Sequence, residues 1–306
     1  MISIVITTWN CRKQIENCLE SLEQQHYRDH EIIVIDQASI DGTGEYLESV
    51  RQRFNLRLIC RKTKGTWAAN NELGISMAKG GWIAVSNPDI VFLPDSLEKL
   101  SVWTGSINEE NFLGCHLLST NGSDVYPLGK LTLANIFHVA SHRTLGTFLD
   151  RKLWRRYFER QFIRRTDNLT GGCYAVDNIN ASFFMIHRKA IEKLGGLWGK
   201  EFRWAVADSD LFERGRRKGI RQIYNHDIRL IHEGEHSRIT SSKPEYEYEY
   251  AYGYNCYAKR WGHVQRLRLL FALDAIVGPV LLSLTGQDTL RNQIRCSAAR
   301  LRGLLG

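Results

Sequence analysis

Cysteine is sparse and scattered in this chain of 306 residues, which argues against two common ways of stabilising a small fold. The seven cysteines are odd in number, and no two of them form a C-x-x-C pair. This pattern speaks against a disulfide framework and against a structural zinc site. Scattered free thiols are more typical of a reducing compartment.

The N-terminus lacks a secretory signal peptide. It has neither a basic first segment nor a small-residue cleavage site, and the run 1–6 has the pattern of a buried strand. We therefore expect a cytoplasmic protein, or one that is peripheral on the cytoplasmic face of the inner or plasma membrane.

The common nucleotide and metal motifs are also missing. No G-x-G-x-x-G follows the first apolar run, and neither a G-x-x-x-x-G-K-[ST] loop nor an H-E-x-x-H helix occurs. Dinucleotide oxidoreductases, P-loop enzymes and zinc metalloproteases therefore lose their main support.

Basic residues exceed acidic ones, which suggests a polyanionic neighbour. The formal net charge is +8, and the excess gathers in residues 151–165 and 256–306. Such a charge fits nucleic acid, an anionic membrane or phosphorylated small molecules, although solvated helix faces are an alternative. No helix-turn-helix, RNA-recognition or zinc-finger pattern is present, so we expect no nucleic-acid partner.

Apolar runs alternate with helical periodicity in the first hundred residues. This alternation predicts an α/β fold with a largely parallel central sheet. The predicted strands are 2–7, 31–36, 56–60 and 82–86, and the predicted helices are 12–25, 45–54 and 67–79.

The remaining chain has weaker patterns. Residues 105–170 show little periodicity and are predicted to be a loop-and-helix insertion. Further elements are predicted as a strand at 180–186, helices at 188–194, 208–218 and 245–262, and an amphipathic Arg-rich tail at 290–305.

Three polar clusters come directly after predicted parallel strands. They are Thr7–Asn10, Asp36–Asp41 and Asn87–Asp89. Ligands of such sheets bind beyond the carboxyl ends of the strands, so we expect these clusters to lie at one edge.

The Asp36–Asp41 cluster has two readings. A carboxylate at a strand end can accept hydrogen bonds from a nucleobase or from ribose hydroxyls, and Ser39 suits a tight turn. The alternative is an ordinary Asx turn that caps the next helix.

Asn87-Pro88-Asp89 can hold a divalent cation on a diphosphate. Pro88 fixes the turn, and a hard cation bound to phosphate oxygens needs few protein carboxylates. The alternative is a turn that merely ends the strand.

Two later clusters carry further candidates. Asp208-Ser209-Asp210 sits at a predicted helix start, where one carboxylate can act as a general base. Simple helix capping is the alternative. His232 follows another strand-like run and can bind a metal or a diphosphate, or it can be a solvated loop histidine.

Taken together and in this order, these motifs resemble family 2 glycosyltransferases of the GT-A fold. The resemblance runs from about residue 2 to residue 237. It includes the opening strand and loop 3–10, the turn 34–43, the helix 64–75, Asn87-Pro88-Asp89 and the run 207–214. The Asn-Pro-Asp form is similar to the rhamnosyltransferase-like and galactofuranosyltransferase-like branch.

The resemblance implies a role for each matching residue. Asp208 would be the catalytic base, and Mg²⁺ or Mn²⁺ would bind at Asp89 and His232. Ala207 and Gln37 depart from the usual Glu and Asn of the family. Donor contacts are expected from Thr7, Asn10, Asp36, Ser39, Asp41, Asn71, Asn87 and Asp89, and acceptor or diphosphate contacts from Asp210, Arg214, His232 and Ser237.

The implied reaction is an inverting transfer from a nucleotide-diphospho-sugar to a hydroxyl of a glycan or a lipid-linked acceptor. dTDP-rhamnose is the first candidate donor, followed by UDP-sugars. Residues 1–240 would form the GT-A domain, with a nucleotide-sugar-binding half at 1–104 and an acceptor and catalytic half at 105–240. A non-catalytic subunit that keeps the fold, or a basic nucleic-acid-binding protein, is the rival interpretation.

Residues 241–306 are expected to be a helical, membrane-associating extension. The run 267–284 has the length of a short span, but two charges and a Gly-Pro pair interrupt it. Arginines at 266–306 favour an interfacial helix on an anionic membrane. The alternative is a buried packing helix with a contact in a homo-oligomer.

Overall fold

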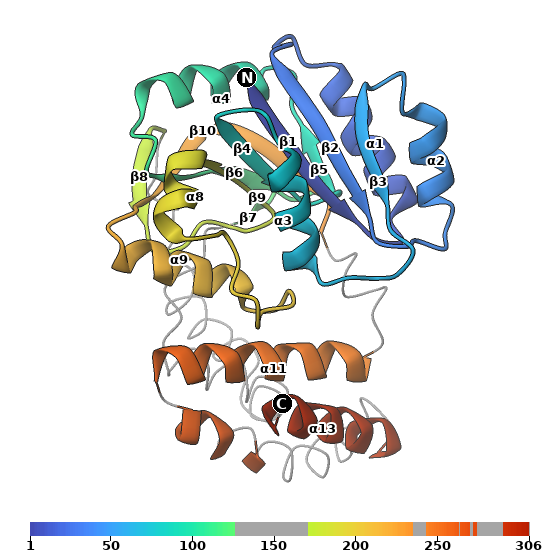
Figure 1. The fold of residues 1–306 in the computed structure, drawn as a ribbon, viewed down its shortest axis with the longest axis vertical. Helices are drawn as coiled ribbons and strands as arrows, with labels where there is room; N and C mark the ends of the chain where they lie inside the picture. The colour runs from blue at the N-terminus through green and yellow to red at the C-terminus, as the bar shows by residue number, and fades with distance from the viewer. Residues whose placement is uncertain (126–170, 235–242, 263, 270–271, 274–289, 306) are drawn as a thin grey trace. The chain divides into compact units, whose positions relative to one another are not determined.

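The computed structural model describes residues 1–125, 171–234, 243–262, 264–269, 272–273 and 290–305 (Figure 1). The chain forms two compact units. The first, here named the sheet unit, comprises Met1–Leu128, Thr166–Gly199 and Leu211–His236. The second, the C-terminal unit, comprises Gly129–Arg165, Lys200–Asp210 and Ser237–Gly306.

The first half of the sheet follows the predicted alternation. Strands β1, β2, β3 and β4 pair in parallel in the order β3-β2-β1-β4, with α1, α2 and α3 as the connecting helices. Their bounds are β1 Ile2–Thr8, α1 Arg12–Glu23, β2 His30–Asp36, α2 Thr43–Val50, β3 Leu56–Cys60, α3 Trp67–Met77 and β4 Trp82–Ser86. The predicted parallel sheet is confirmed here.

Beyond β4 the sheet is mixed. β9 is antiparallel to both β4 and β6, β10 runs parallel to β6, and β5 closes the order as an antiparallel neighbour of β10. The bounds are β5 Ile90–Phe92, β6 Phe112–Leu118, β7 Asp124–Val125, β8 Cys173–Val176, β9 Phe183–His187 and β10 Gln222–His232. The largely parallel sheet predicted for the start of the chain therefore does not extend to the whole.

Strand β6 corrects one prediction. Residues 105–170 were expected to be an inserted segment of loops and helices, yet Phe112–Leu118 is a central strand whose first six residues are buried. Because side chains on both faces of this strand are buried, the segment lacks the alternation of apolar and polar residues that marks a half-exposed strand. Residues 126–170 of that segment lie outside the described residues.

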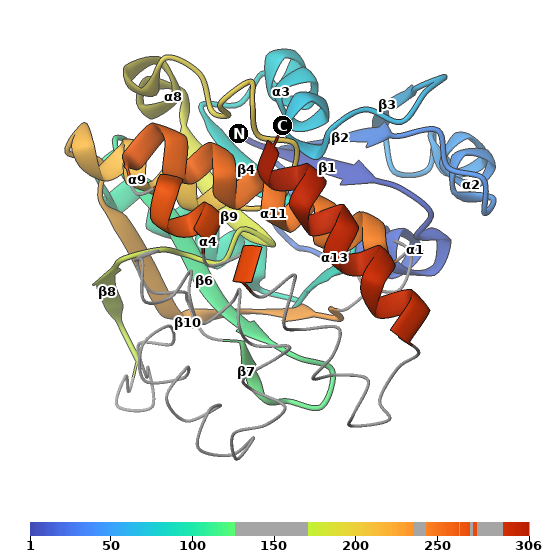
Figure 2. The same ribbon diagram turned by 90° about the horizontal axis from the view of Figure 1, so that it is seen from below.

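Helices cover both faces of the sheet (Figures 1 and 2). Ile4 and Ile6 of β1 join a core with α1, α2 and α4 (Ser96–Ser106). On the other face, α3 packs so closely that a side chain at Gly74 would overlap the Val5 side chain. The alternating side chains of β1 thus bury against a helix layer on each side.

The C-terminal unit contains two long helices that pack side by side. These are α11 (Lys243–Trp261) and α13 (Leu290–Leu305). A side chain at Gly303 would lie 2.5 Å from the carbonyl oxygen of Tyr248, so this glycine permits the close approach. Arg300 Nε donates to Glu247 Oε2 at 2.5 Å in the buried interface between the helices.

The predicted helices at 245–262 and 290–305 are confirmed as α11 and α13. Among the described residues, none of the helices is long and apolar enough to cross a bilayer. Most of the apolar run 267–284 lies outside the described residues.

Candidate functional site

The ends of β1, β2 and β4 place three polar clusters at one edge of the sheet unit. Thr8 pairs with Asp36, and Ile6 pairs with Ser86, so the strands end almost level. The strand pairing therefore brings Thr7, Asp36 and Asn87 to the same edge of the sheet, with Asp36 and Asn87 on either side of β1. We call the group formed by these strand ends and the loops that follow them the donor edge.

A hydrogen-bonded loop joins the clusters after β1 and β2. Asp36 is buried, and its carboxylate accepts from the Ser39 hydroxyl at 2.5 Å and from the Ser39 N–H at 3.1 Å. Ser39 Oγ in turn accepts from the Asn10 N–H at 2.9 Å, while Asn10 Oδ1 accepts from the Ile40 N–H. Asn10 and Ala38 both have positive φ, as a loop this tight requires.

Asp41 is engaged within the chain. One oxygen accepts from the Thr43 N–H and hydroxyl, and the other accepts from the Arg12 N–H at 3.1 Å. Although burial opposes the shift, these hydrogen bonds lower the pKa of the Asp41 carboxyl. Asp41 therefore ties the start of α2 to the start of α1, as the Asx-turn interpretation describes. A contact with the donor stays a prediction for this residue.

Unsatisfied polar atoms mark the area around Thr7 and the start of α3. Within the described chain, Thr7 Oγ1, Asn70 Nδ2 and Asn71 Oδ1 are buried and have no hydrogen-bond partner. A buried polar group without a partner costs free energy, which a bound polar ligand can recover. Thr7 and Asn71 were predicted donor residues.

Sequence reasoning missed Arg61 and Asn70. Arg61 Nη1 donates to Asn70 Oδ1 at 3.1 Å, and Asn70 is fully buried. Asn70 stands beside the predicted donor residue Asn71, and that pairing was the available signal.

Asp89 is a buried carboxylate, and one of its oxygens has no hydrogen-bond partner within the described chain. It is 6% exposed, and its Oδ2 lies 3.4 Å from His232 Nε2 at the end of β10. The Asp89 carbonyl accepts from the Glu233 N–H at 2.9 Å, which holds the two segments together. Asp89 Oδ1 has no hydrogen-bond partner among the described residues. Asn87, just before it, is fixed by its N–H donating to the Ser182 carbonyl.

The donor set at Asp89 suits a hard divalent cation that shares its coordination with a ligand. Mg²⁺ and Mn²⁺ accept carboxylate oxygen and, for Mn²⁺, imidazole nitrogen, and such ions keep several positions for water or phosphate oxygens. The described residues include no cluster of three or more His, Cys, Asp or Glu that could hold a metal ion by itself. The open Asp89 oxygen and His232 therefore fit a cation that a diphosphate helps to bind.

Asp208 lies in the first turn of α9 (Ala207–Arg217), in the part of that helix that belongs to the C-terminal unit. One of its oxygens accepts from the Ser209 N–H at 2.7 Å. Burial raises the pKa of the Asp208 carboxyl above its ordinary value, although the Ser209 hydrogen bonds oppose the shift. Burial also raises the pKa of Tyr254, and the Asp208 charge adds to that effect. A raised pKa is what a general base needs if it is to accept a proton.

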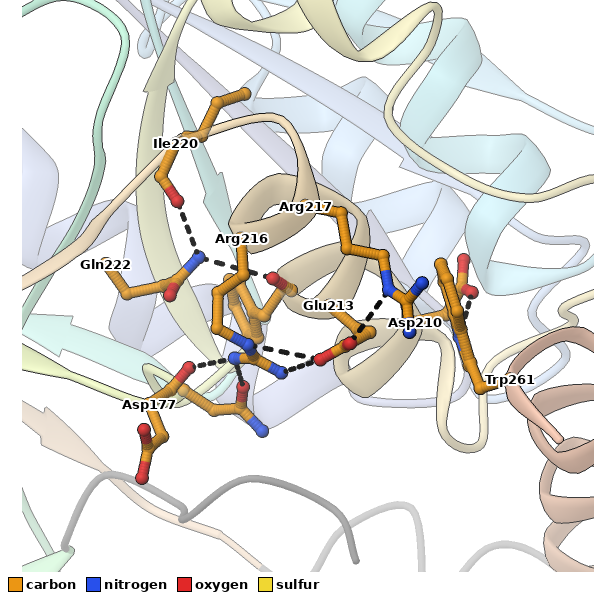
Figure 3. A network of polar contacts seen from close by, with 10 residues as sticks. Asp177, Asp210, Glu213, Arg216, Arg217, Ile220, Gln222 and Trp261 are labelled. Atoms are coloured by element: carbon orange, nitrogen blue, oxygen red, sulfur yellow. Dashed lines mark hydrogen bonds and ion pairs between the residues drawn. The ribbon is translucent and has the colours of Figure 1, made fainter. Parts of the chain in front are cut away.

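Asp210, two residues further, is completely buried. Its Oδ2 accepts from Arg260 Nη1 at 2.7 Å, and its Oδ1 accepts from Trp261 Nε1 at 3.0 Å. Figure 3 shows the indole of Trp261 against this carboxylate. Both oxygens thus have partners at the end of α11, and an acceptor contact for Asp210 stays a prediction.

The rest of α9 belongs to the sheet unit. Arg214, a predicted diphosphate contact, donates to the carbonyls of Gly196 and Leu197. Glu213 accepts from Arg216 at 2.6 Å and from Arg217 at 3.0 Å (Figure 3). The Arg214 bonds fix the helix against the loop that follows α8 (Arg188–Leu194), whereas the Glu213 bonds lie within α9 itself.

The predicted site residues divide between the two units. Asp208 and Asp210 lie in the C-terminal unit, and Ser237 lies outside the described residues. The sheet unit holds Thr7, Asn10, Asp36, Ser39, Asp41, Asn71, Asn87, Asp89, Arg214 and His232.

Comparisons with known proteins add an independent finding. The profile of the family described as Glycosyl transferase family 2 matches residues 3–195. A curated N-acetylglucosaminyl-diphospho-decaprenol L-rhamnosyltransferase of Mycobacterium tuberculosis is 24% identical over 248 residues, which cover 78% of this chain and 77% of that protein. Glycosyltransferase GlyG of Streptococcus pneumoniae is 32% identical over 101 residues, covering 33% of this chain, and the match spans only 34% of GlyG.

Two solved structures share the fold at low sequence identity. The mannosyltransferase PcManGT of Pyrobaculum calidifontis, in complex with GDP-Man and Mn²⁺, aligns with a TM-score of 0.55 at 14% identity, over 99% of this chain and 86% of that one. S. aureus TarS 1–349 in complex with UDP-GlcNAc aligns with a TM-score of 0.55 at 17% identity, over 97% and 79%. The chain has a GT-A-like α/β fold and belongs to Glycosyl transferase family 2.

Proposed function

We propose that the protein transfers a sugar, with inversion, from a nucleotide-diphospho-sugar to a hydroxyl of a glycan or a lipid-linked acceptor in the synthesis of a cell-surface polysaccharide. The observation that carries the proposal is Asp89, a buried carboxylate with an open oxygen beside His232 at the donor edge. A buried polar atom without a partner in the folded chain is a place where a bound ion, a water molecule or a ligand group can complete the hydrogen bonding.

The donor edge would bind the nucleotide part of the donor. The Asp36 carboxylate, fixed by Ser39, can accept from a base or ribose group, and the open atoms of Thr7 and Asn71 offer further polar contacts. Asp89 and His232 would hold Mg²⁺ or Mn²⁺, which, when bound, supplies positive charge to the leaving diphosphate.

Asp208 would take the proton from the acceptor hydroxyl as that oxygen attacks the anomeric carbon. Its raised pKa supports this role, because a carboxylate that is costly to keep ionised accepts a proton more readily. A single displacement at the anomeric carbon inverts its configuration.

The relatives bear on the choice of sugar and acceptor. The M. tuberculosis relative, named for transfer of L-rhamnose to a diphospho-decaprenol-linked sugar, aligns over more than three quarters of both chains. We therefore propose dTDP-rhamnose as the first donor to test, and a diphospho-lipid-linked sugar as the first acceptor. UDP-sugars come next.

The donor assignment can be tested by thermal shift. We expect one nucleotide-sugar of a panel to raise the melting temperature only in the presence of Mn²⁺ or Mg²⁺. Asp89→Ala should abolish this metal-dependent rise in melting temperature, because it removes the carboxylate oxygen that has no hydrogen-bond partner. The exposed Asp29 provides a control: it comes just before β2, whereas Asp36 ends that strand, so Asp29→Ala should keep the response. A donor response in Asp89→Ala equal to wild type would refute the metal site, and a wild type that binds donor but never transfers sugar would favour a non-catalytic subunit.

We also propose that α13 rests on an anionic membrane surface on the cytoplasmic face. One side of α13 carries large exposed apolar residues, namely Ile294 at 53%, Leu301 at 37% and Leu305 at 79%. Arg291, Arg295 and Arg302 are exposed around them, and α13 contains no Asp or Glu. Apolar residues flanked by arginines are typical of a helix in the interface of anionic lipids. We call this group the α13 stripe.

Flotation with phosphatidylglycerol vesicles tests the stripe. Full-length protein should float, whereas the triple variant Ile294→Asn, Leu301→Asn and Leu305→Asn should not. These exposed substitutions leave the face that packs on α11 intact. Val102 is also exposed, but it lies on α4 of the sheet unit, so Val102→Asn is the matched control and should float like wild type. Equal flotation of the triple variant would exclude the stripe as the membrane contact, and a shift in sedimentation mass instead would assign it to a homo-oligomer.

A further inference from the structure

The segment Lys200–Asp210, which carries Asp208, contacts α11 along most of that helix. Trp204 packs on Tyr250 with ring centroids 5.2 Å apart, and Arg203 pairs with Glu249 at 2.8 Å. Toward the end of α11, Arg260 pairs with Glu201 and Asp210. All of these residues belong to the C-terminal unit.

Among these contacts between the segment and α11, Asp210 is the side chain that is held most firmly. Asp210 is completely buried, and both of its oxygens accept hydrogen bonds, from Arg260 and from Trp261. A buried carboxylate is held firmly when charge-assisted bonds occupy both oxygens, because breaking either leaves a charge without compensation. The end of α11 therefore fixes the first turn of α9 at one point.

A second constraint lies just before that turn. Val206 has a φ of 65°, in the left-handed region that a β-branched residue rarely adopts. α11 passes directly against it, since a side chain at Gly253 would overlap the carbonyl of Ala205. Backbone in such a conformation persists only where its surroundings hold it. α11 thus holds the entry to α9 as well as its first turn.

We propose that Arg260 and Trp261 are positioning residues for catalysis: by fixing Asp210, they set the direction in which the first turn of α9 presents Asp208. The inference rests on the proposed role of Asp208 as the base. Asp208 and Asp210 belong to the same helical turn, so a rotation of that turn moves both carboxylates. General-base catalysis depends on placing the base within hydrogen-bond reach of the attacking hydroxyl, and a displacement of about 1 Å costs about 10²-fold in rate.

A set of variants separates positioning from stability. The double variant Asp210→Asn with Arg260→Met replaces the buried ion pair with neutral groups of similar size, so no buried charge is left uncompensated. We expect it to fold, with kcat reduced by about 10²-fold and the KM for the donor unchanged. Trp261→Phe keeps an aromatic side chain but removes the indole N–H, and we expect a smaller loss of kcat, about tenfold. Arg260→Lys, which retains the charge, should lie closer to wild type than Arg260→Met alone.

The Arg203–Glu249 pair supplies the matched control. It joins the same two segments by an ion pair, but Arg203 is 44% exposed, in contrast to the buried Asp210. Arg203→Ala should therefore keep kcat near wild type. Circular dichroism and the melting temperature of each variant report on its fold.

The outcomes are distinct. A folded double variant and a folded Trp261→Phe that both turn over like wild type would overturn the inference. A rise in the acceptor KM for Asp210→Asn alone, with normal Trp261→Phe, would also overturn it and would assign Asp210 to the acceptor instead. If Asp208→Asn turns over like wild type, the proposed base has failed, whatever the behaviour of Arg260.

Discussion

The donor edge takes its side chains from the ends of parallel strands, whereas the Asp208 segment takes its geometry from a helix about fifty residues later in the chain. At the donor edge, Thr8 and Asp36 are brought level by strand register. Two residues after Asp208, Asp210 is held by Arg260 across a separation of 50 residues. One arrangement follows from local patterns and the other from long-range packing.

This difference agrees with the reach of the family profile. The match covers residues 3–195, so it contains Asp36 and Asp89 but ends before Asp208. The part of the chain that the profile leaves unmatched contains Asp208, Asp210 and their contacts with α11.

The sharpest test of the comparison is Asp208→Asn. We expect kcat to fall by about 10³-fold, because the amide cannot accept the proton of the acceptor hydroxyl. Donor affinity, measured by calorimetry, should stay at the wild-type value, since the donor edge is untouched. Near wild-type turnover would show that another group is the base.

The dependence of activity on pH is expected to reflect the ionisation of Asp208. Burial raises the pKa of Asp208 above its ordinary 3.8, so the residue becomes protonated at a higher pH than a solvated aspartate does. Only the deprotonated form is a base. Activity should therefore be lost as the pH falls through the raised pKa, by about tenfold for each pH unit below it.

The profile of kcat against pH gives the check, with donor binding measured over the same range as the control. Tyr250 and Tyr254 have pKa values raised above their usual range, chiefly by burial, so they stay neutral across this range. An acid limb at the pKa of an ordinary, solvated aspartate would contradict the assignment.

Glu247→Ala is expected to destabilise the C-terminal unit selectively. The substitution removes the carboxylate that Arg300 faces in the buried contact between α11 and α13, and breaking such a pair costs about 3 kcal/mol. Hydrogen exchange should accelerate in α11 and α13 and stay unchanged in β1 and β2. Glu245, exposed on the same helix, gives the control Glu245→Ala. A uniform loss of protection in both units would show that they unfold as one.

Ser39→Ala should have the smallest effect. The hydroxyl bridges Asp36 and Asn10, and its loss removes bonds worth about 1 kcal/mol, equivalent to about fivefold in donor affinity. Turnover at saturating donor should not change. A change in kcat with unaltered donor affinity would place Ser39 outside the donor edge.

Much of the sheet unit could be predicted because its signals are local. Strands β1, β2 and β4 each end in a polar residue, and the predicted strand 56–60 coincides with β3. Strand β6 was missed because its buried faces left no alternation, and its Gly114 and His116 weakened the apolar run. His116 is buried and hydrogen-bonded to Tyr224, a partner 108 positions away that no local pattern indicates.

The candidate site shows the same limit. Asp36, Asp89 and His232 were predicted because each lies at, or just after, the end of a strand. Asp210 was also singled out, but its partners Arg260 and Trp261 were not, because their place opposite Asp210 depends on how α11 packs. The sequence showed α11 only as a tyrosine-rich helix. Its fit against Ala205 through Gly253 is visible only in three dimensions.

The Asp210–Arg260 pair also restricts how this chain can be recombined with its relatives. An exchange of C-terminal segments between two such proteins joins the loop before α9 from one parent to α11 from the other. If the second parent lacks a cation and an indole at the positions of Arg260 and Trp261, the hybrid keeps Asp210 without these two partners. This residue lies in the same helical turn as Asp208, the proposed base. Such a chimera would still capture donor, and it would be mistaken for a natural sugar-nucleotide-binding protein without activity.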